Sequence, residues 1–374
     1  MIPYGHQKIN NDDIEAVVSA LKSDWITQGP LVKEFEDKIS EYCGSKYAVA
    51  VSSGTAALHC AYYAAGIKNG DEVIMPAQTF IATSNAVLYL GAKPVFCDID
   101  LETCNIDTSL IEGLITKKTK AIVPVHIAGE PCNMDEILKI ADKYNLVVIE
   151  DACHALGSEY KGKKIGSISD MTVFSFHPVK SITTGEGGVI CTDNKEYYNA
   201  MCNFRTHGIS QQEESERKIK EPWYFEMQDL GYNYRITDFQ CALGKTQLSK
   251  LNNFIEKRKK IAKYYNDTLK NINGLVLPAF NNSNTSSLHL YIVRVDKNIR
   301  REVFTKLRGA GIGVQVHYIP VYHHPYYRKN GFDNFSLHNT EKYYETCISL
   351  PIYPDLKQKD QDFVIEKLKD FIYD

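Results

Sequence analysis

Short apolar stretches alternate with helical patterns along the first half of the chain. The apolar stretches are rich in β-branched residues and cover residues 47–52, 72–76, 94–98, 121–126, 146–151, 171–175 and 188–192. Longer periodic stretches lie between several of them, at residues 56–65, 80–90 and 134–144. Near-continuous apolar strands separated by helices are typical of βαβ units and a sheet covered on both faces. The pattern predicts an α/β fold with a mostly parallel sheet, whose ligand binds beyond the carboxyl ends of the strands.

The second half of the chain predicts a smaller α/β domain. A helical pattern without proline covers residues 237–269, with Thr237 or Asp238 as its cap. It is followed by a strand at 289–295, a helix at 301–310, a strand at 313–318, a loop rich in proline and aromatic residues at 319–327, and a last helix at 360–372. The charged stretch 211–222 predicts a mobile surface loop. We therefore expect an amino-terminal arm and large domain over residues 1–245, and a small domain over residues 246–374.

Composition excludes several classes of protein. The chain has 374 residues, and its 43 Lys and Arg against 46 Asp and Glu give a formal charge of -3, so no basic surplus indicates a nucleic-acid partner. The amino terminus lacks the features of a signal peptide, and no apolar run approaches the roughly 18 residues of a membrane span, so we expect a cytoplasmic protein without membrane contact. Ten scattered cysteines without a C-x-x-C pair indicate neither a disulfide framework nor a zinc site.

Two candidate features follow strand ends in the first half. The segment Ser52-Ser53-Gly54-Thr55 lies where the first strand ends and a helix begins, so its free N–H groups and hydroxyls could bind a phosphate, or Ser53 could be a simple helix cap. No G-x-G-x-x-G follows that strand, and Gly244-Lys245-Thr246 lacks the earlier glycine of a P-loop. Phe80 follows the second strand, where an aromatic ring could stack on a planar ligand or pack in the core.

Two charged residues follow later strands. Asp151 ends an apolar strand, and its carboxylate could hold a proton on a heteroaromatic nitrogen, or it could be a loop acid or helix cap. Lys180 follows the sixth strand in Ser175-Phe176-His177-Pro178-Val179-Lys180, where Pro178 disfavours helix and places the lysine on a loop. A lone lysine is more often a solvated surface charge. A phosphate cup, an aromatic ring, a carboxylate and an amine together are what pyridoxal 5'-phosphate requires.

The whole chain resembles the DegT-type sugar-nucleotide aminotransferases. Motifs of this family occur in the expected order, as SSGTAAL, PAQTFIATSNA, EDACHALG, SFHPVKSITTGEGG, RTHGI, LGYNYRITDFQCALGKTQL and GIGVQVHYIPVY. The resemblance implies fold type I of the pyridoxal phosphate enzymes, in which a large domain with a mostly parallel seven-stranded sheet covered by helices carries the cofactor. It also implies a homodimer with active sites at the subunit interface.

The resemblance assigns roles to residues of this sequence. It implies that Lys180 binds the cofactor covalently, that Asp151 pairs with the pyridine nitrogen, that His154 lies near the ring and that Phe80 stacks on it. Phosphate binding is implied for Gly54, Thr55 and Ser175, with Asn233 supplied by the partner subunit. Substrate binding is implied for Tyr4, Asp24, Trp25, Ile26, Thr27, Gln315, Val316, His317 and Tyr318.

The motifs SFHPVK, ITTGEGG and VQVHY are most similar to one branch of the family. That branch transfers the amino group of L-glutamate to C4 of a UDP-4-keto-6-deoxy-N-acetylhexosamine, giving UDP-4-amino-4,6-dideoxy-N-acetyl-β-L-altrosamine on the route to pseudaminic acid. The sequence has Ser53-Gly54-Thr55 where that branch often has Ser-Ala-Thr, so other nucleotide-linked 4-keto or 3-keto sugars, such as a UDP-4-keto-pentose, stay open.

The sequence disfavours two other classes of protein and a metal site. Sugar dehydratases with the same cofactor have histidine in place of Lys180, and a non-catalytic relative would be expected to lack Lys180 or Asp151, so both are disfavoured. A metal site at His317, His323 and His324 is disfavoured because no acids or cysteines stand at ligand spacing.

Overall fold

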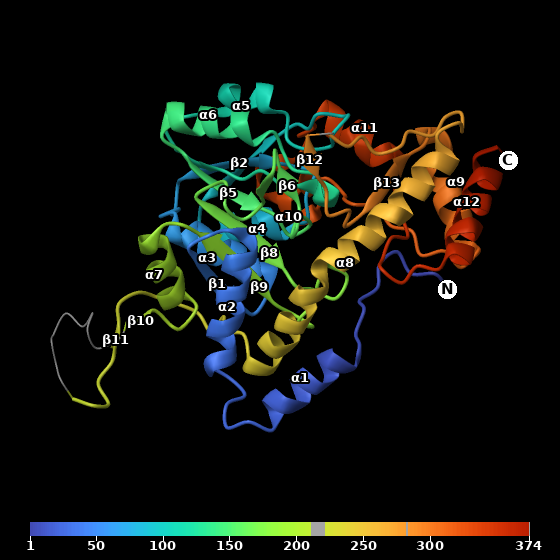
Figure 1. The fold of residues 1–374 in the computed structure, drawn as a ribbon. Helices are drawn as coiled ribbons and strands as arrows, with labels where there is room; N and C mark the ends of the chain where they lie inside the picture. Colours follow the sequence, from blue (N-terminus) through green and yellow to red (C-terminus); the bar gives the residue numbers. More distant parts are fainter. Residues whose placement is uncertain (211–220, 282, 374) are drawn as a thin grey trace.

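A seven-stranded sheet forms the centre of the computed structural model, which describes residues 1–210, 221–281 and 283–373 (Figure 1). The strand order is β1-β9-β8-β5-β4-β2-β3. The strands are β1 (Tyr47–Val51), β2 (Glu72–Pro76), β3 (Lys93–Cys97), β4 (Thr119–Ile122), β5 (Val147–Asp151), β8 (Met171–Ser175) and β9 (Gly188–Thr192). Only β9 runs against its neighbours, and the other pairings are parallel. The prediction of a mostly parallel seven-stranded sheet is confirmed.

Helices cover both faces of this sheet. One face packs against α2 (Pro30–Cys43), α5 (Thr108–Leu114), α6 (Met134–Tyr144) and the first part of α8 (Asp238–Leu269), and the other against α3 (Gly54–Ala64), α4 (Ala82–Tyr89) and α7 (Lys195–Phe204). Side chains alternate along β5, where Val148 packs in the first layer and Ile149 in the second. Glu150 and Asp151, at the end of this strand, therefore point to opposite faces.

The carboxyl-terminal part of the chain has its own apolar core. It packs β13 (Tyr291–Arg294) and β14 (Cys347–Leu350), which are antiparallel, against α9 (Lys297–Gly309), α12 (Gln358–Tyr373) and the second part of α8. Side chains of α8 up to Ile255 belong to the core of the sheet, and those from Ile261 onward belong to the second core. The expected boundary at residue 245 thus falls within the first part of this continuous helix, which joins the two cores (Figure 1).

The remaining elements are short or peripheral. They are α1 (Asn11–Leu21), η1 (Ile127–Gly129), β6 (Glu159–Tyr160), β7 (Lys163–Lys164), β10 (Ile209–Ser210), β11 (Glu226–Met227), β12 (Asn284–Thr285), η3 (Val321–His323), α10 (Pro325–Tyr327), η4 (Arg328–Phe332) and α11 (His338–Thr346). No helix among the described residues is both long and apolar enough to cross a membrane. Most of the charged stretch 211–222, expected as a surface loop, lies outside the described residues.

The expected strand at 313–318 does not form, and this prediction is wrong. Among the residues that the structure describes, its one ladder contact is a bridge between Gln315 and Ser349. Gly313 N–H donates instead to the Ile2 carbonyl at 2.6 Å, and the His317 carbonyl accepts from the Tyr343 hydroxyl at 2.9 Å. The backbone groups are therefore satisfied by the amino-terminal arm, by a side chain and by Ser349 alone of β14, whose continuous ladder is with β13.

Long-range contacts of α8 tie the layers together. Its cap is Thr237, whose N–H and hydroxyl both donate to Gln240 Oε1. Asp238 instead caps α2, because its carboxylate accepts from Gly29 N–H at 2.8 Å and Leu31 N–H at 3.0 Å. Further along, the buried guanidinium of Arg258 donates to three carbonyls outside the helix, those of Leu288, His289 and Ile352.

Candidate active site

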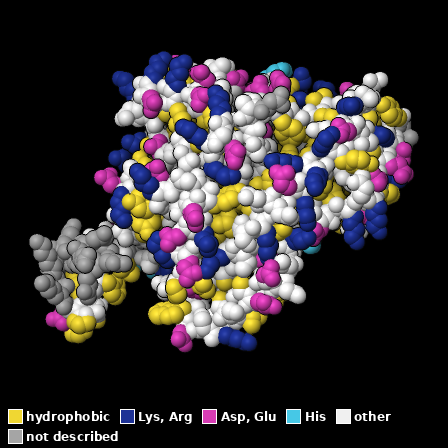
Figure 2. Space-filling model, viewed as in Figure 1, with side chains coloured by type: hydrophobic (Ala, Val, Ile, Leu, Met, Phe, Trp, Pro, Cys, Tyr) yellow, Lys and Arg dark blue, Asp and Glu magenta, His cyan; other side chains and the backbone are white. Residues whose placement is uncertain are grey.

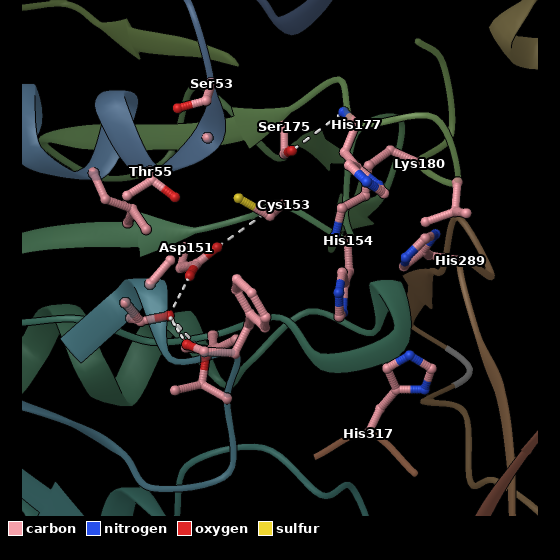
Figure 3. A pocket seen from close by; sticks show the side chains of 18 of the residues that line it. Ser53, Thr55, Asp151, Cys153, His154, Ser175, His177, Lys180, His289 and His317 are labelled. Carbon is pink, nitrogen blue, oxygen red and sulfur yellow. Dashed lines mark hydrogen bonds between the residues drawn. The ribbon is translucent and has the colours of Figure 1, made fainter. Parts of the chain in front are cut away.

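A cavity of about 450 Å³ opens beyond the carboxyl ends of β1, β2, β5 and β8. Ten residues that the sequence assigns to the site line it: Tyr4, Gly54, Thr55, Phe80, Asp151, His154, Ser175, Lys180, His317 and Tyr318. In Figure 3, Ser53 and Thr55 lie at one end of this cavity, and His154, His289 and His317 lie at the other. The fold therefore brings together residues from the arm, four strand ends and the small domain.

The phosphate end is built from the start of α3. Ser53 caps this helix, with its hydroxyl accepting from Ala56 N–H at 3.1 Å, and Gly54 and Thr55 follow at the first helical positions. A Cβ on Gly54 would lie 2.9 Å from the Ser175 Cβ, so only glycine lets the helix approach the end of β8 this closely. The free N–H groups of the first turn and the nearby hydroxyls suit a phosphate dianion.

The Asp151 carboxylate is 5% exposed at the end of β5. Its Oδ2 accepts from the Thr83 hydroxyl at 2.7 Å, and its Oδ1 accepts from Cys153 N–H at 3.2 Å. Its backbone is bonded to the neighbouring segment, since Asp151 N–H donates to the Pro124 carbonyl and the Asp151 carbonyl accepts from His126 N–H. This carboxylate is held by neutral donors at both oxygens.

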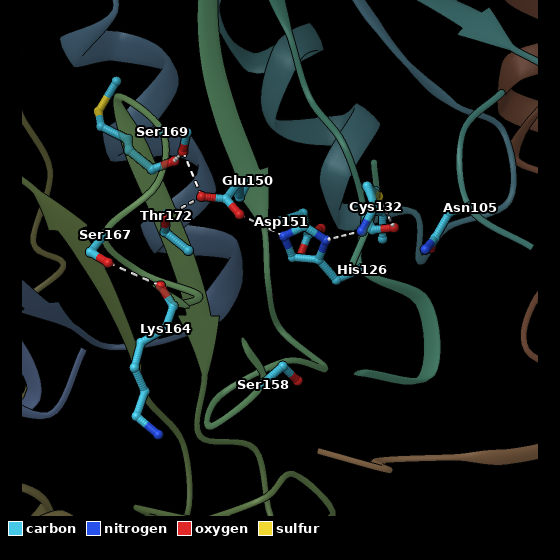
Figure 4. Close-up of polar contacts among 12 residues, drawn as sticks. Asn105, His126, Cys132, Glu150, Asp151, Ser158, Lys164, Ser167, Ser169 and Thr172 are labelled. Carbon is cyan, nitrogen blue, oxygen red and sulfur yellow. Dashed lines mark hydrogen bonds and ion pairs between the residues drawn. The ribbon is translucent and has the colours of Figure 1, made fainter. Parts of the chain in front are cut away.

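A second carboxylate anchors the same strand end from the opposite face (Figure 4). The fully buried Glu150 accepts from His126 Nε2 at 2.7 Å, from the Ser169 hydroxyl at 2.7 Å and from the Thr172 hydroxyl at 2.8 Å. His126 Nδ1 accepts from Cys132 N–H, and His126 Nε2 carries the proton that is donated to Glu150. These hydrogen bonds lower the pKa of Glu150 despite the opposing effect of its burial. The network ties β5 to the segment that follows β4.

Lys180 lies in the turn expected from Pro178. Its N–H donates to the His177 carbonyl at 2.9 Å, and its half-buried side chain lines the cavity. Within the described ranges its amine has no hydrogen bond or ion pair. Burial lowers the pKa of Lys180, although the nearby Cys153 and Asp151 act in the opposite direction. A lowered pKa increases the share of free amine, which is the nucleophilic form.

The far end of the cavity is lined by neutral imidazoles. Burial, with a smaller effect of the Lys180 charge, lowers the pKa of His317 to about 3, and it also holds the pKa values of His154 and His289 well below the usual range. His154 Nδ1 accepts from Ala128 N–H at 3.3 Å, so the ring proton is on Nε2, which donates to the Tyr318 hydroxyl at 2.9 Å. The Tyr318 proton is then free to point at another acceptor.

Several lining residues were missed from the sequence. They are Thr79, Thr83, Cys153, His177, Glu186 and His289. Thr83 had a weak signal, because it and Ser84 are polar positions on a helix that otherwise buries small apolar residues. His289 had none, since it was only the first residue of an expected strand.

Seven predicted site residues do not line this chain's own cavity. Asp24 and Trp25 line a separate depression between α1 and the start of α8, Ile26 is exposed next to them, and Thr27 forms a bridge with Thr237. Asn233 is exposed and pairs with Thr206. Gln315 and Val316 precede the two lining residues His317 and Tyr318, but are themselves outside the cavity lining.

Comparison with known proteins decides the family. Residues 7–369 match the DegT/DnrJ/EryC1/StrS aminotransferase family. The chain belongs to this family. It is 46% identical over 97% of its length to an uncharacterised protein of Methanocaldococcus jannaschii, of which it covers 96%. It is 42% identical over 98% of its length to the UDP-4-amino-4,6-dideoxy-N-acetyl-β-L-altrosamine transaminase of Campylobacter jejuni, of which it also covers 96%.

Solved structures of this aminotransferase family share the whole fold. A Helicobacter pylori aminotransferase involved in the biosynthesis of pseudoaminic acid, PseC, superposes with a TM-score of 0.94 at 32% identity, covering all of this chain and 99% of the other. The pyridoxal phosphate form of a putative sugar aminotransferase from Streptococcus pneumoniae superposes with a TM-score of 0.93 at 32% identity, covering all of this chain and 98% of that one. The family, fold type I and the use of pyridoxal phosphate are as the sequence predicted: the chain is a pyridoxal phosphate-dependent sugar aminotransferase.

The residues of the cavity fit this cofactor. The close approach at Gly54 leaves free N–H groups for the phosphate, the Asp151 carboxylate is available to a protonated ring nitrogen, and Lys180 presents an unpaired amine. The Phe80 ring is 55% exposed and its centroid lies 5.9 Å from that of Tyr318, so its face is open to a stacking partner in the cavity.

We predict that Lys180→Ala abolishes the borohydride-reducible link between cofactor and chain. Turnover should fall by several orders of magnitude, because both the nucleophile and the proton carrier are lost. Mass spectrometry after reduction and steady-state kinetics check this, with Lys139→Ala, on an exposed helix position, as the control. A Lys180→Ala protein with a reducible link or wild-type turnover would contradict the assignment.

We predict that the free energy of unfolding falls at acid pH, in part because His317 is buried. Because the folded pKa of His317 lies below its unfolded value near 6.5, its contribution is complete above about pH 6.5 and is lost as pH falls, at up to about 1.4 kcal/mol per pH unit. When the pH falls from 7 to 5, the free energy of unfolding of His317→Gln, measured with urea, should therefore decrease by about 2 kcal/mol less than that of the wild type. The exposed-site variant His338→Gln should follow the wild type, and equal slopes in all three proteins would refute the prediction.

Proposed function

We propose that this enzyme transfers the amino group of L-glutamate to C4 of a UDP-4-keto-6-deoxy-N-acetylhexosamine, giving UDP-4-amino-4,6-dideoxy-N-acetyl-β-L-altrosamine and 2-oxoglutarate. The observation that carries this proposal is the end-to-end similarity to the Campylobacter transaminase named for that product. The structural likeness to the Helicobacter aminotransferase of pseudoaminic acid biosynthesis supports it.

The groups that line the cavity support a catalytic role for each of them. When bound, the cofactor supplies an aldehyde that condenses with amines and a ring that takes up the electron pair left by proton removal. The Lys180 amine would accept the proton from the donor's α-carbon and pass it on. Asp151 holds a proton on the ring nitrogen. The start of α3, Ser175 and the Phe80 ring retain the cofactor while no covalent bond holds it.

The substrate end requires neutral hydrogen-bonding groups. Tyr4, His317 and Tyr318 line it, and burial raises the pKa values of both tyrosines, so their hydroxyls keep their protons. Such groups suit sugar hydroxyls and an acetamido group. Gln315 and Val316 lie directly beside them in the chain and complete the proposed sugar-binding segment.

We further propose that the active unit is a homodimer. Asn233 lies outside this chain's cavity, and Thr27 is bridged to Thr237 a few residues away from it, so both lie on one part of the surface. The same part exposes large apolar side chains, Trp223, Phe225, Met227 and Leu230, which is unusual for a surface that stays in water. They belong to the segment around β11, at the lower left of Figure 2. In the dimer, Asn233 and the segment from Asp24 to Thr27 would serve the cavity of the partner subunit.

The function is tested with purified enzyme, L-glutamate and a panel of nucleotide-linked keto sugars. We expect kcat/KM to be highest for the UDP-4-keto-6-deoxy-N-acetylhexosamine, and NMR of the product to show the amine at C4 in the altro configuration. The panel includes a UDP-4-keto-pentose and a 3-keto sugar nucleotide. Preference for either of these two sugars would replace the proposed substrate. Preference for a simple keto acid would contradict the proposal that the acceptor is a sugar nucleotide.

The dimer is tested by complementation. When Asn233→Ala and Lys180→Ala subunits exchange, a mixed dimer contains one site with both lesions and one with neither, so activity should return to on the order of a quarter of all sites. Each variant alone should stay inactive or severely impaired. A monomer that is fully active during sedimentation at assay concentration would contradict the shared site.

A further inference from the structure

A buried chain of hydroxyl groups leads to the carboxylate of Asp151. Thr83 Oγ1 lies 2.7 Å from Asp151 Oδ2, and Thr79 Oγ1 lies 2.7 Å from Thr83 Oγ1. Both threonines are at most 2% exposed, and both border the cavity. Three nearly buried oxygens in a row must share their protons in a defined order.

Counting protons fixes that order. Thr83 has one hydroxyl proton, and with Asp151 charged that proton is donated to the carboxylate, which is the stronger acceptor. Thr83 can then only accept from Thr79, so both hydroxyls point toward Asp151. The Phe80 carbonyl lies 3.1 Å from Thr83 Oγ1 and is the competing acceptor when the carboxylate is not charged.

The position of Thr83 is fixed from the other side. The Tyr62 hydroxyl, in the buried layer of α3, donates to the Thr83 carbonyl at 3.0 Å. Among the described residues, Asp151 forms no ion pair, and its other donor is the longer bond from Cys153 N–H at 3.2 Å. The Thr83 hydroxyl is therefore the shortest hydrogen bond that the carboxylate accepts from this chain.

We propose that Thr79 and Thr83 are positioning residues that keep Asp151 charged and so keep the proton on the ring nitrogen of pyridoxal phosphate. Two aligned donors stabilise the carboxylate as an anion, so the proton between Asp151 and the pyridine nitrogen resides on nitrogen. The relay rests on the proposed pairing of Asp151 with that nitrogen. No residue of α4 was expected at the site from the sequence. Through Thr83, this helix would help to set the protonation state of the cofactor.

The test uses holoenzyme loaded with pyridoxal phosphate that carries 15N in its ring. Wild type and Thr83→Ser, which keeps the hydroxyl, should show the 15N chemical shift of a protonated nitrogen. Thr83→Val keeps the shape and removes the donor, so the shift should move toward that of neutral pyridine. The single-turnover rate with glutamate should fall about tenfold or more in Thr83→Val, as expected for a lost hydrogen bond to a charged group.

Two further variants separate the possible failures. Thr79→Val should move the shift in the same direction by a smaller amount, and it carries the test if Thr83→Val does not fold. If Asp151→Asn leaves the nitrogen protonated, the role of Asp151 fails. If Asp151→Asn loses the proton while Thr83→Val and Thr79→Val keep the wild-type shift, only the relay fails. Equal effects of Thr83→Ser and Thr83→Val would assign the position to packing and overturn the proposal.

Discussion

A carboxylate buried at the end of a strand is the constraint on which the site depends. Removing a carboxylate from water is costly unless donors replace its hydration. The chain supplies these donors to Asp151 from α4 and from its own loop, and it fixes the backbone of Asp151 through the segment after β4. On the opposite face of the same strand, Glu150 and His126 form a second satisfied pair. Glu150, which anchors β5 in the fold, and Asp151, which faces the cavity, are neighbours in this strand. β5 therefore links the fold to the chemistry of the site.

The far end of the cavity is lined by neutral groups, and the cavity's charged lining residues are Asp151, Lys180 and Glu186. Its three buried histidines are neutral, its tyrosines keep their protons, and the pKa of Lys180 is lowered. In such surroundings we propose that the start of α3 binds the cofactor phosphate through N–H groups and hydroxyls rather than through a cation of this chain. Retention of the cofactor then depends on many weak contacts at once, which agrees with the number of residues committed to it.

Local pattern was sufficient for the sheet and for the residues at its strand ends. Apolar β-branched runs marked all seven strands because those strands are buried on both faces. Asp151 was found because it ends such a run, and Lys180 because it lies on the loop that follows one. The prediction of a strand at 313–318 was wrong because the backbone groups of this segment form hydrogen bonds with residues far away in the chain. No local pattern reveals such contacts. Thr83 and His289 were missed for the same reason: their roles arise from contacts to residues far apart in the chain. The roles of Asp24 to Thr27 and of Asn233 in the cavity of a partner subunit remain predictions.

The most direct test of this account is a crystal structure of the enzyme with pyridoxamine phosphate, the form that no covalent bond retains. We expect the pyridine nitrogen within hydrogen-bond distance of Asp151, the phosphate on the N–H groups of Gly54 and Thr55, and the Thr83 hydroxyl still bonded to Asp151 Oδ2. A cofactor whose ring nitrogen faces another group, or whose phosphate lies away from the start of α3, would contradict the account.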